Sequence, residues 1–286
     1  MNPIHYRNLV RLALEEDLGR AGDLTTDSIV PAAARSRAVI AARRPGRVAG
    51  TDVAAEAFRQ LDPEVEIETL IADGEDVQSG QVIARLRGPS RALLSGERTA
   101  LNFMGHLCGI ATVTREIVEA VAGYDSRIVC TRKTTPGLRA LEKYAVRMGG
   151  GCNHRFGLDD AVLIKDNHLK VAGSVKEALS RVRRRVGHMV KVELEVDTLQ
   201  QLEQALSLGE APGLKRPALD AVLLDNMPLD ELRRAVQMCR GQVISEASGG
   251  ITPETAAQVA ACGPDLISVG WITHSAPTLD LGLDFE

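Results

Sequence analysis

Charged and small polar residues follow a series of short apolar runs in the second half of the sequence. The apolar runs are residues 128–130, 161–164, 190–194, 221–224, 242–244 and 266–269. The residues at their carboxyl ends or in adjoining loops are Thr131, Arg132, Lys133, His154, Arg155, Lys165, Glu195, Asp225, Ser248, Gly249, Gly250, Ser268, Val269 and Gly270. In a parallel α/β barrel the carboxyl ends of all strands share one rim. We therefore expect these residues to meet in a single site.

The side chains at these positions carry both signs of charge. The cations are Arg132, Lys133, Arg155 and Lys165. Such groups bind carboxylates or phosphates, and arginine can do so through two parallel hydrogen bonds. The acids Glu195 and Asp225 can hold ribose hydroxyls, a divalent metal ion or a developing positive charge. The combination indicates a site for a sugar phosphate and a polycarboxylate.

The segment Ser248-Gly249-Gly250 comes shortly before an expected helix whose N-cap is Thr252. Bare backbone amides at a helix start can bind phosphate, and late loops of α/β barrels commonly do so. An ordinary tight turn is the alternative interpretation. No His and Asp partners for Ser248 are evident in the sequence, and the P-loop pattern G-x-x-x-x-G-K-[ST] is absent. The sequence therefore favours positioning and electrostatics over a covalent nucleophile.

The elements that must position these residues alternate between strand and helix from about residue 124 onwards. Expected helices cover residues 137–148, 174–186, 198–208, 229–239 and 253–261, with Ser174, Asp197 and Thr252 as N-caps. Alternation of this kind with nearly continuous apolar strands predicts a parallel sheet. Six units suit a closed or nearly closed α/β barrel, and an open doubly wound sheet is the alternative.

The first part of the chain mixes both kinds of element without a repeat. We expect helices at 4–17 and 52–61, strands at 36–42, 65–71 and 81–87, and a long helix at 91–122 that breaks near Gly105 and Gly109. The stretch from Asp73 to Ile83 resembles the hairpin of lipoyl and biotinyl carrier domains. Such carriers need an exposed Lys at a turn, and none occurs in this region, so the hairpin is expected to be scaffold.

Composition excludes several other classes of protein. The net charge is −4 and the pI about 5.9, so no general basic field exists to hold nucleic acid. The five cysteines are an odd number and show no C-x-x-C spacing, which argues against a disulfide framework or a structural zinc site. No stretch of about 18 apolar residues is present to span a membrane. We expect a soluble cytoplasmic enzyme.

Several long polar motifs closely resemble those of the quinolinate phosphoribosyltransferase family, and the likeness extends over almost the whole chain. The motifs are Glu16-Asp17-Leu18-Gly19, Gly22-Asp23-Leu24-Thr25-Thr26, Gly96-Glu97-Arg98-Thr99-Ala100-Leu101-Asn102, Thr131-Arg132-Lys133-Thr134-Thr135-Pro136-Gly137, His154-Arg155-Phe156-Gly157-Leu158, Leu163-Ile164-Lys165-Asp166-Asn167-His168 and Ser248-Gly249-Gly250-Ile251. The resemblance implies an N-terminal α/β sandwich domain over 1–110 and an incomplete α/β barrel over 111–286, with the segment near 271–286 packing back on the first domain. It also implies a homodimer or hexamer in which Arg98 reaches the neighbouring subunit's site.

The activity implied by this resemblance is transfer of phosphoribosyl from 5-phosphoribosyl 1-pyrophosphate to the nitrogen of quinolinate, with decarboxylation, in NAD biosynthesis. Quinolinate would be held by Arg132, His154, Arg155, Lys165 and the neighbour's Arg98, with Thr131 beside them. The 5-phosphate would lie on Ser248-Gly249-Gly250 and Ser268-Val269-Gly270, and Lys133 would meet pyrophosphate. Catalysis would rest on Lys133, Lys165, Glu195 and Asp225, and these two acids would bind ribose hydroxyls or Mg²⁺.

The residues leave alternatives open. A related phosphoribosyltransferase-like protein associated with molybdate transport would share the fold but use another acceptor, and a non-enzymatic carrier module is a different class. His168 could be catalytic or cap the following helix, and Glu193 is a lesser candidate because it lies deeper in its strand than Glu195. His106 and His274 are expected to be structural, and the basic run from Arg181 to Arg185 a solvated helix face. The Pro- and Gly-rich segment 209–217 looks longer than usual in the family and is expected to be a surface loop.

Overall fold

The computed structural model describes residues 1–209 and 218–286 of the chain. The segment expected as a surface loop, 209–217, therefore lies outside the described residues except for Gly209. The chain forms two compact units. The first contains Met1–Arg115, Thr134–Gly151 and Trp271–Glu286, and the second contains Glu116–Lys133 and Cys152–Gly270.

The first unit is built around an antiparallel sheet of four strands in the order β12-β1-β5-β3. These strands are β1 (Arg35–Ala42), β3 (Glu66–Thr69), β5 (Val82–Pro89) and β12 (Leu281–Phe285), and a short pair is formed by β2 (Gly46–Arg47) and β4 (Asp76–Val77). The helices are η1 (Pro3–His5), α1 (Arg7–Leu18), α2 (Leu24–Ile29), α3 (Thr51–Leu61), the first part of α4 (Ser90–Ala120), α5 (Arg139–Met148) and α11 (Trp271–His274). Helices and sheet together make an α/β sandwich, as the sequence predicts.

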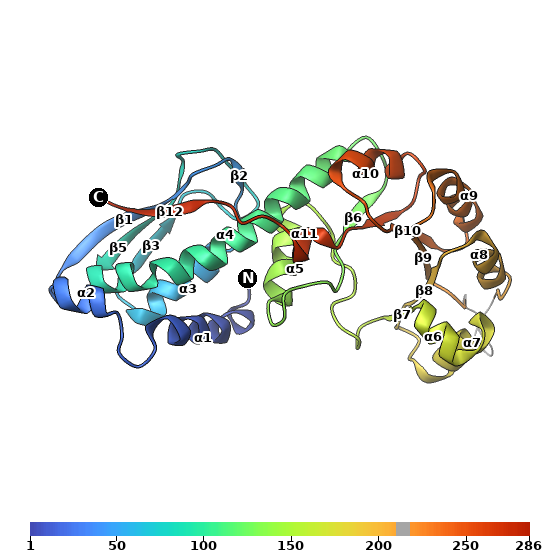
Figure 1. Cartoon of the computed structure of the whole chain (residues 1–286), viewed down its shortest axis with the longest axis horizontal. Coiled ribbons are helices and arrows are strands. Elements are labelled where there is room, and N and C mark those ends of the chain that lie inside the picture. Colours follow the sequence, from blue (N-terminus) through green and yellow to red (C-terminus); the bar gives the residue numbers. More distant parts are fainter. Residues whose placement is uncertain (210–217) are drawn as a thin grey trace. The chain divides into compact units, whose positions relative to one another are not determined.

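The last strand of the chain completes this sheet, because β12 pairs with β1 along Ala38 to Ala42. Figure 1 shows the red C-terminal strand running beside the blue β1. Side chains of β5 alternate between buried and exposed over much of its length, which is typical of a half-buried strand. Phe58 of α3 and Leu86 of β5 are among the fully buried side chains of this unit.

Helix α4 continues without interruption through Gly105 and Gly109, where a break was predicted. The prediction was wrong because these glycines serve a close approach and not a helix end. A Cβ atom at Gly109 would lie 2.0 Å from the carbonyl oxygen of Pro277, and one at Gly105 would lie 2.9 Å from that of Leu279. The bare face of the helix thus allows the returning C-terminal backbone to contact it directly.

The second unit is an incomplete α/β barrel with a parallel sheet of six strands in the order β6-β11-β10-β9-β8-β7. The strands are β6 (Arg127–Val129), β7 (Val162–Ile164), β8 (Val192–Val196), β9 (Ala221–Asp225), β10 (Ile244–Ser248) and β11 (Leu266–Ser268), and the helices are α6 (Asp166–Ala172), α7 (Val175–Arg185), α8 (Leu199–Leu206), α9 (Leu229–Cys239) and α10 (Pro253–Ala260). Their order along the chain appears in Figure 1 as the run of colours from green to red.

Local details of this unit differ from the sequence-based expectations. Strand β10 begins at Ile244, where the expected strand ended. The N-cap of α8 is Thr198 and not Asp197, because the Thr198 side chain accepts the amide hydrogen of Gln201. Ser174 caps α7 as predicted. The short helix α6, directly after β7, was missed.

The run from Arg181 to Arg185 is not wholly a solvated face. The Arg183 side chain is 2% exposed and its Nη2 atom lies 2.8 Å from Asp220 Oδ2. Its Nε atom donates to the carbonyl oxygen of Ala218 at 2.8 Å. The helical period carries this one arginine to the buried side, whereas Arg181 stays outside and pairs with Glu177.

The boundaries of the compact units differ from a single cut near residue 110. Residues 134–151, which include α5, belong to the first unit. Its fully buried Glu142 contacts His106, and its Tyr144 hydroxyl donates to Asp73 at 2.7 Å. Asp73 also accepts the amides of Gly50 and Thr51, so the carrier-like hairpin is tied into this scaffold. Among the described residues, none of the helices combines the length and the apolarity that crossing a membrane would require.

Candidate active site

Strand register places the predicted residues at one edge of the parallel sheet. Ser248 at the end of β10 is level with Asp225 of β9 and with Ser268 of β11. Glu195 of β8 is level with Leu223, two residues before Asp225. Because side chains two apart in a strand share a face, Glu195 and Asp225 lie on the same side of the sheet. The rim that the sequence predicts is therefore formed by these strands.

Lys165 and Glu195 form an ion pair at this rim. The lysine directly follows β7, and its Nζ atom lies 2.8 Å from Glu195 Oε2. The Glu195 side chain is largely buried, whereas half of the lysine remains exposed. A half-exposed ammonium next to a carboxylate can exchange that partner for an incoming anion at modest cost.

Arg132 and Arg155 lie close enough to repel each other. The pKa of Arg155 is lowered by burial and then by the charge of Arg132, whereas Glu193 and Asp160 act in the opposite direction. Among residues 1–209 and 218–286, the buried Nε atom of Arg132 finds no hydrogen-bond partner. Two neighbouring guanidinium groups, one with an unused buried donor, form a place where an anion would be stabilised.

The loop that carries Arg155 is held in shape by its own backbone contacts. The Nη1 atom of Arg155 donates to the carbonyl oxygen of Ala161 at 2.8 Å. The carboxylate of Asp160 accepts the amides of Phe156 and Gly157 at 2.6 and 3.1 Å. Burial opposes ionisation of Asp160, but these two amides outweigh it, so its pKa is lowered. Asp160 thus stays ionised and fixes the turn after Arg155.

The Ser248-Gly249-Gly250 segment requires glycine because of its backbone conformation and a close contact at Gly249. Gly249 has φ of 107° and Gly250 has φ of 59°, both in the region that favours glycine. A Cβ atom at Gly249 would lie 2.1 Å from Oδ1 of Asn226, which follows β9 and itself has φ of 52°. The Asn226 amide group donates to Asp225 Oδ2 at 2.7 Å. The ends of β9 and β10 are thus packed against each other beside the acid Asp225.

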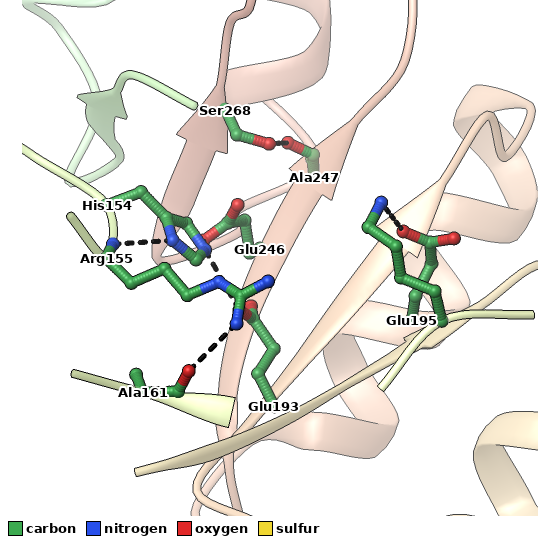
Figure 2. Close-up of polar contacts among 9 residues, drawn as sticks. His154, Arg155, Ala161, Glu193, Glu195, Glu246, Ala247 and Ser268 are labelled. Carbon is green, nitrogen blue, oxygen red and sulfur yellow. Dashed lines mark hydrogen bonds and ion pairs between the residues drawn. The ribbon is translucent and has the colours of Figure 1, made fainter. Parts of the chain in front are cut away.

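A buried cluster of His154, Glu193 and Glu246 lies on the inner face of the same sheet. Figure 2 shows the imidazole of His154 directed toward both carboxylates, with the Arg155 guanidinium beside Glu193. Sequence reasoning gave Glu193 a lesser place and missed Glu246. The available signal was an acid at a buried position inside each strand, Glu193 in Val-Glu-Leu-Glu-Val and Glu246 in Ile-Ser-Glu-Ala-Ser.

Other predicted residues have different surroundings. The backbone amide of Val269 donates to the carbonyl oxygen of Val129 at 2.9 Å, so that donor is already used. The Ser268 hydroxyl donates to the carbonyl oxygen of Ala247 at 3.3 Å. Lys133 has an exposed side chain in the loop after β6, where its amide donates to Thr131 Oγ1.

Arg98 belongs to the first unit and not to the unit that holds the other predicted residues. It lies on α4 and lines an open pocket whose other residues include Glu16, Asp17 and His106. The pocket is therefore of mixed charge. The contribution of Arg98 to a neighbouring subunit's site stays a prediction.

His168, which the sequence left open, and His106, which was expected to be structural, have clear partners. Nδ1 of His168 accepts the amide of Lys165 at 2.8 Å, so His168 closes the first turn of α6. Nε2 of His106 lies 2.9 Å from the fully buried carboxylate of Glu142. The same carboxylate accepts the amide of Thr135, which follows the Arg132 and Lys133 loop. Within the described residues, His168 and His106 thus both have structural roles.

Comparisons with known proteins agree with the motifs. The model of the quinolinate phosphoribosyl transferase N-terminal domain matches residues 23–108, and that of the C-terminal domain matches residues 110–284. A probable nicotinate-nucleotide pyrophosphorylase of Bacillus subtilis is 43% identical over 99% of this chain and 94% of its own. A quinolinate phosphoribosyltransferase of Nicotiana glauca is 36% identical over 98% of this chain and 82% of its own.

Solved structures give the same result for the fold. The nicotinate-nucleotide pyrophosphorylase from Francisella tularensis superimposes with a TM-score of 0.93 and 37% identity, covering 100% of this chain and 98% of the other. Its similarity therefore includes both the sandwich and the incomplete barrel. Matches to both domain models and full-length relatives above 40% identity show that this chain belongs to the quinolinate phosphoribosyltransferase family.

Proposed function

We propose that this enzyme transfers the phosphoribosyl group of 5-phosphoribosyl 1-pyrophosphate to the ring nitrogen of quinolinate, releasing pyrophosphate and CO₂ and forming nicotinate mononucleotide. The observation that carries the proposal is the presence in one unit of the neighbouring pair Arg132 and Arg155 and of the Lys165–Glu195 ion pair. Full-length relatives named for this activity support it. The relatives do not favour the molybdate-associated alternative.

The dicarboxylate acceptor would be held by the cations of the rim. Arg132 and Arg155 repel each other in the free enzyme, so an anionic carboxylate between them would relieve that repulsion. The buried Nε of Arg132 would gain a partner. Lys165 would contribute to the same binding, and Arg98 of a neighbouring copy would complete it in a homodimer or hexamer.

The phosphoribosyl donor would lie along the ends of β9, β10 and β11. Ser248, Gly249 and Gly250 would receive the 5-phosphate, and the positive φ angles of the two glycines bring bare backbone close to a ligand. Gly270 and Ser268 adjoin this segment through the pairing of β10 with β11. Lys133, exposed at the end of the loop after β6, would meet pyrophosphate.

The carboxylates of Glu195 and Asp225 fit a hard divalent cation. They come from adjacent strands and face the same side of the sheet. Mg²⁺ is usually held by one or two carboxylates together with substrate phosphates, which is the donor set available here. When bound, Mg²⁺ would neutralise the charge of the pyrophosphate leaving group.

The chain's own groups can account for the remaining chemistry by position and charge. Cleavage of the ribosyl C1–O bond develops positive charge on the sugar, which Glu195 and Asp225 would stabilise. The ring nitrogen then bonds to C1 and becomes positively charged. That charge accepts the electron pair left when the adjacent carboxylate departs as CO₂, and a proton replaces it. No covalent bond to the protein is needed.

The test is a product assay with purified protein, Mg²⁺ and 5-phosphoribosyl 1-pyrophosphate, offering quinolinate or nicotinate separately. We expect pyrophosphate and CO₂ with quinolinate alone. Pyrophosphate with nicotinate, or none with either acceptor, would refute the proposal. Gel filtration and mixing of Arg98→Ala with Lys165→Ala subunits would test the shared site, because only mixed assemblies could regain one intact site.

We also place the enzyme in the cytoplasm, consistent with its five free cysteines.

A further inference from the structure

Two buried carboxylates from non-adjacent strands converge on one imidazole. Glu193 of β8 is 7% exposed and Glu246 of β10 is 1% exposed. Nε2 of His154 lies 2.9 Å from Glu193 Oε2 and 3.5 Å from Glu246 Oε2. Strand β9 lies between β8 and β10, so the two acids meet across the concave face of the sheet and not along a shared ladder (Figure 2).

The hydrogen bonds of the ring define its tautomer. The backbone amide of Arg155 donates to Nδ1 of His154 at 2.7 Å, which requires that Nδ1 carry no proton. The proton of the neutral ring must then reside on Nε2, where it is donated to Glu193. Both ring nitrogens are thus used within the protein.

The buried position of the cluster favours the protonated form of Glu246. Burial, together with the nearby charge of Glu193, raises the pKa of Glu246 to about 7, while the Ser268 hydroxyl acts in the opposite direction. One of the acids therefore stays protonated under mildly acidic conditions. Arg155 faces the other acid, and that attraction partly offsets the effects of burial and Arg132 on its pKa.

We propose that Glu193 and Glu246 are positioning residues, which hold the imidazole of His154 and thereby fix the adjoining Arg155 in the anion-binding rim. His154 and Arg155 are linked directly, because they are consecutive residues and the backbone amide of Arg155 donates a hydrogen bond to the His154 ring. Glu193 also attracts the Arg155 guanidinium directly. The role in substrate binding rests on the proposed function, whereas the role in fixing the ring does not.

The first experiment measures the ring itself. In protein labelled with ¹⁵N-histidine, the signal of His154 is assigned by its loss in His154→Asn among the six histidines. We expect Nε2–H with Nδ1 unprotonated from pH 6 to pH 8. Glu193→Ala should release the ring to a mixture of tautomers, and Glu193→Gln should retain the native one because its amide oxygen still accepts the hydrogen bond. An Nδ1–H tautomer in the wild type would overturn the proposal.

The second experiment separates positioning from a general loss of structure. Glu193→Ala should raise the KM for quinolinate about tenfold or more while leaving the KM for 5-phosphoribosyl 1-pyrophosphate within about twofold, and Glu193→Gln should restore most of the loss. Glu203→Gln, which alters an exposed acid on α8, is the matched control. Equal increases of both KM values would refute the proposal, and so would an unchanged KM for quinolinate.

The two experiments distinguish this proposal from the proposed function. A wild-type enzyme that does not use quinolinate would end the proposed function, while the tautomer measurement would still decide whether the acids hold the ring. The donor atoms of the three residues lie within 4.8 Å of one another, as they would around a bound cation. A stoichiometric metal ion that is retained by wild-type protein and lost in Glu246→Gln would therefore overturn the hydrogen-bonded arrangement described here.

Discussion

Replacing Glu246 with glutamine should change how the stability of the protein depends on pH. The pKa of Glu246 is raised from its ordinary 4.5 to about 7 because burial and Glu193 disfavour the ionised form. The folded state therefore holds this proton more tightly than the unfolded state does. Stability from this group is fully present below pH 4.5 and is lost as pH rises through 7.

The size of the effect follows from the two pKa values. At pH 5 the proton contributes on the order of 2–3 kcal/mol to the free energy of unfolding in the wild type, and this contribution disappears by about pH 8. The glutamine side chain of the Glu246→Gln variant would resemble the protonated acid at every pH and would show no such loss. Relative to the wild type, Glu246→Gln should therefore gain stability as the pH increases.

The measurement is urea unfolding of both proteins at several pH values, followed by circular dichroism. Titration of groups distant from Glu246 is common to both proteins and cancels in the difference between them. The His154, Glu193 and Ser268 side chains that face Glu246 stay in place in both proteins. Parallel stability curves from pH 5 to pH 8 would refute the reasoning, because they would mean that Glu246 is ionised in the folded state throughout.

Three further substitutions test other parts of the structure. Lys165→Ala should lower kcat/KM for quinolinate by about 30- to 1000-fold, corresponding to roughly 2–4 kcal/mol for a charged contact, and near-normal turnover would remove this lysine from the site. Asp220→Ala should destabilise the protein by about 3–5 kcal/mol in urea unfolding, because it leaves the buried Arg183 without its carboxylate. If Asp220→Ala lowers the free energy of unfolding by less than about 1 kcal/mol, water must reach the Arg183 guanidinium. Gly109→Ala should lower the free energy of unfolding by about 1–3 kcal/mol, because the new Cβ atom would lie 2.0 Å from a carbonyl oxygen. Gly123→Ala should leave the stability unchanged, because no atom lies within 4 Å of the position of its Cβ. Equal melting temperatures for the two glycine variants would contradict the close approach.

The barrel and its rim could be predicted because they depend on local signals. Apolar runs mark parallel strands, and topology then brings their carboxyl ends together whatever the details of the loops. That is why Lys165 and Glu195, far apart in the sequence, were expected in one site and lie in contact. The positions of individual helix ends were less well predicted, because neighbouring residues such as Asp197 and Thr198 are both good caps.

Features that depend on contacts between distant segments could not be predicted in the same way. Gly105 and Gly109 look like a helix break until the returning backbone of residues 277–279 is seen against them. The partnership of Glu193 with Glu246 depends on the curvature of the sheet, which no local pattern encodes. Arg183 looks like one of a solvated basic run because its partner, Asp220, lies beyond the next strand and helix.

The pairing of β12 with β1 has a consequence for how the chain is made. During synthesis β1 leaves the ribosome long before its neighbour, so one side of it stays open while the barrel unit is completed. An unpaired strand edge readily accepts a strand from another molecule. We expect nascent chains, and chains trimmed at residue 280, to need chaperone protection that the intact protein does not.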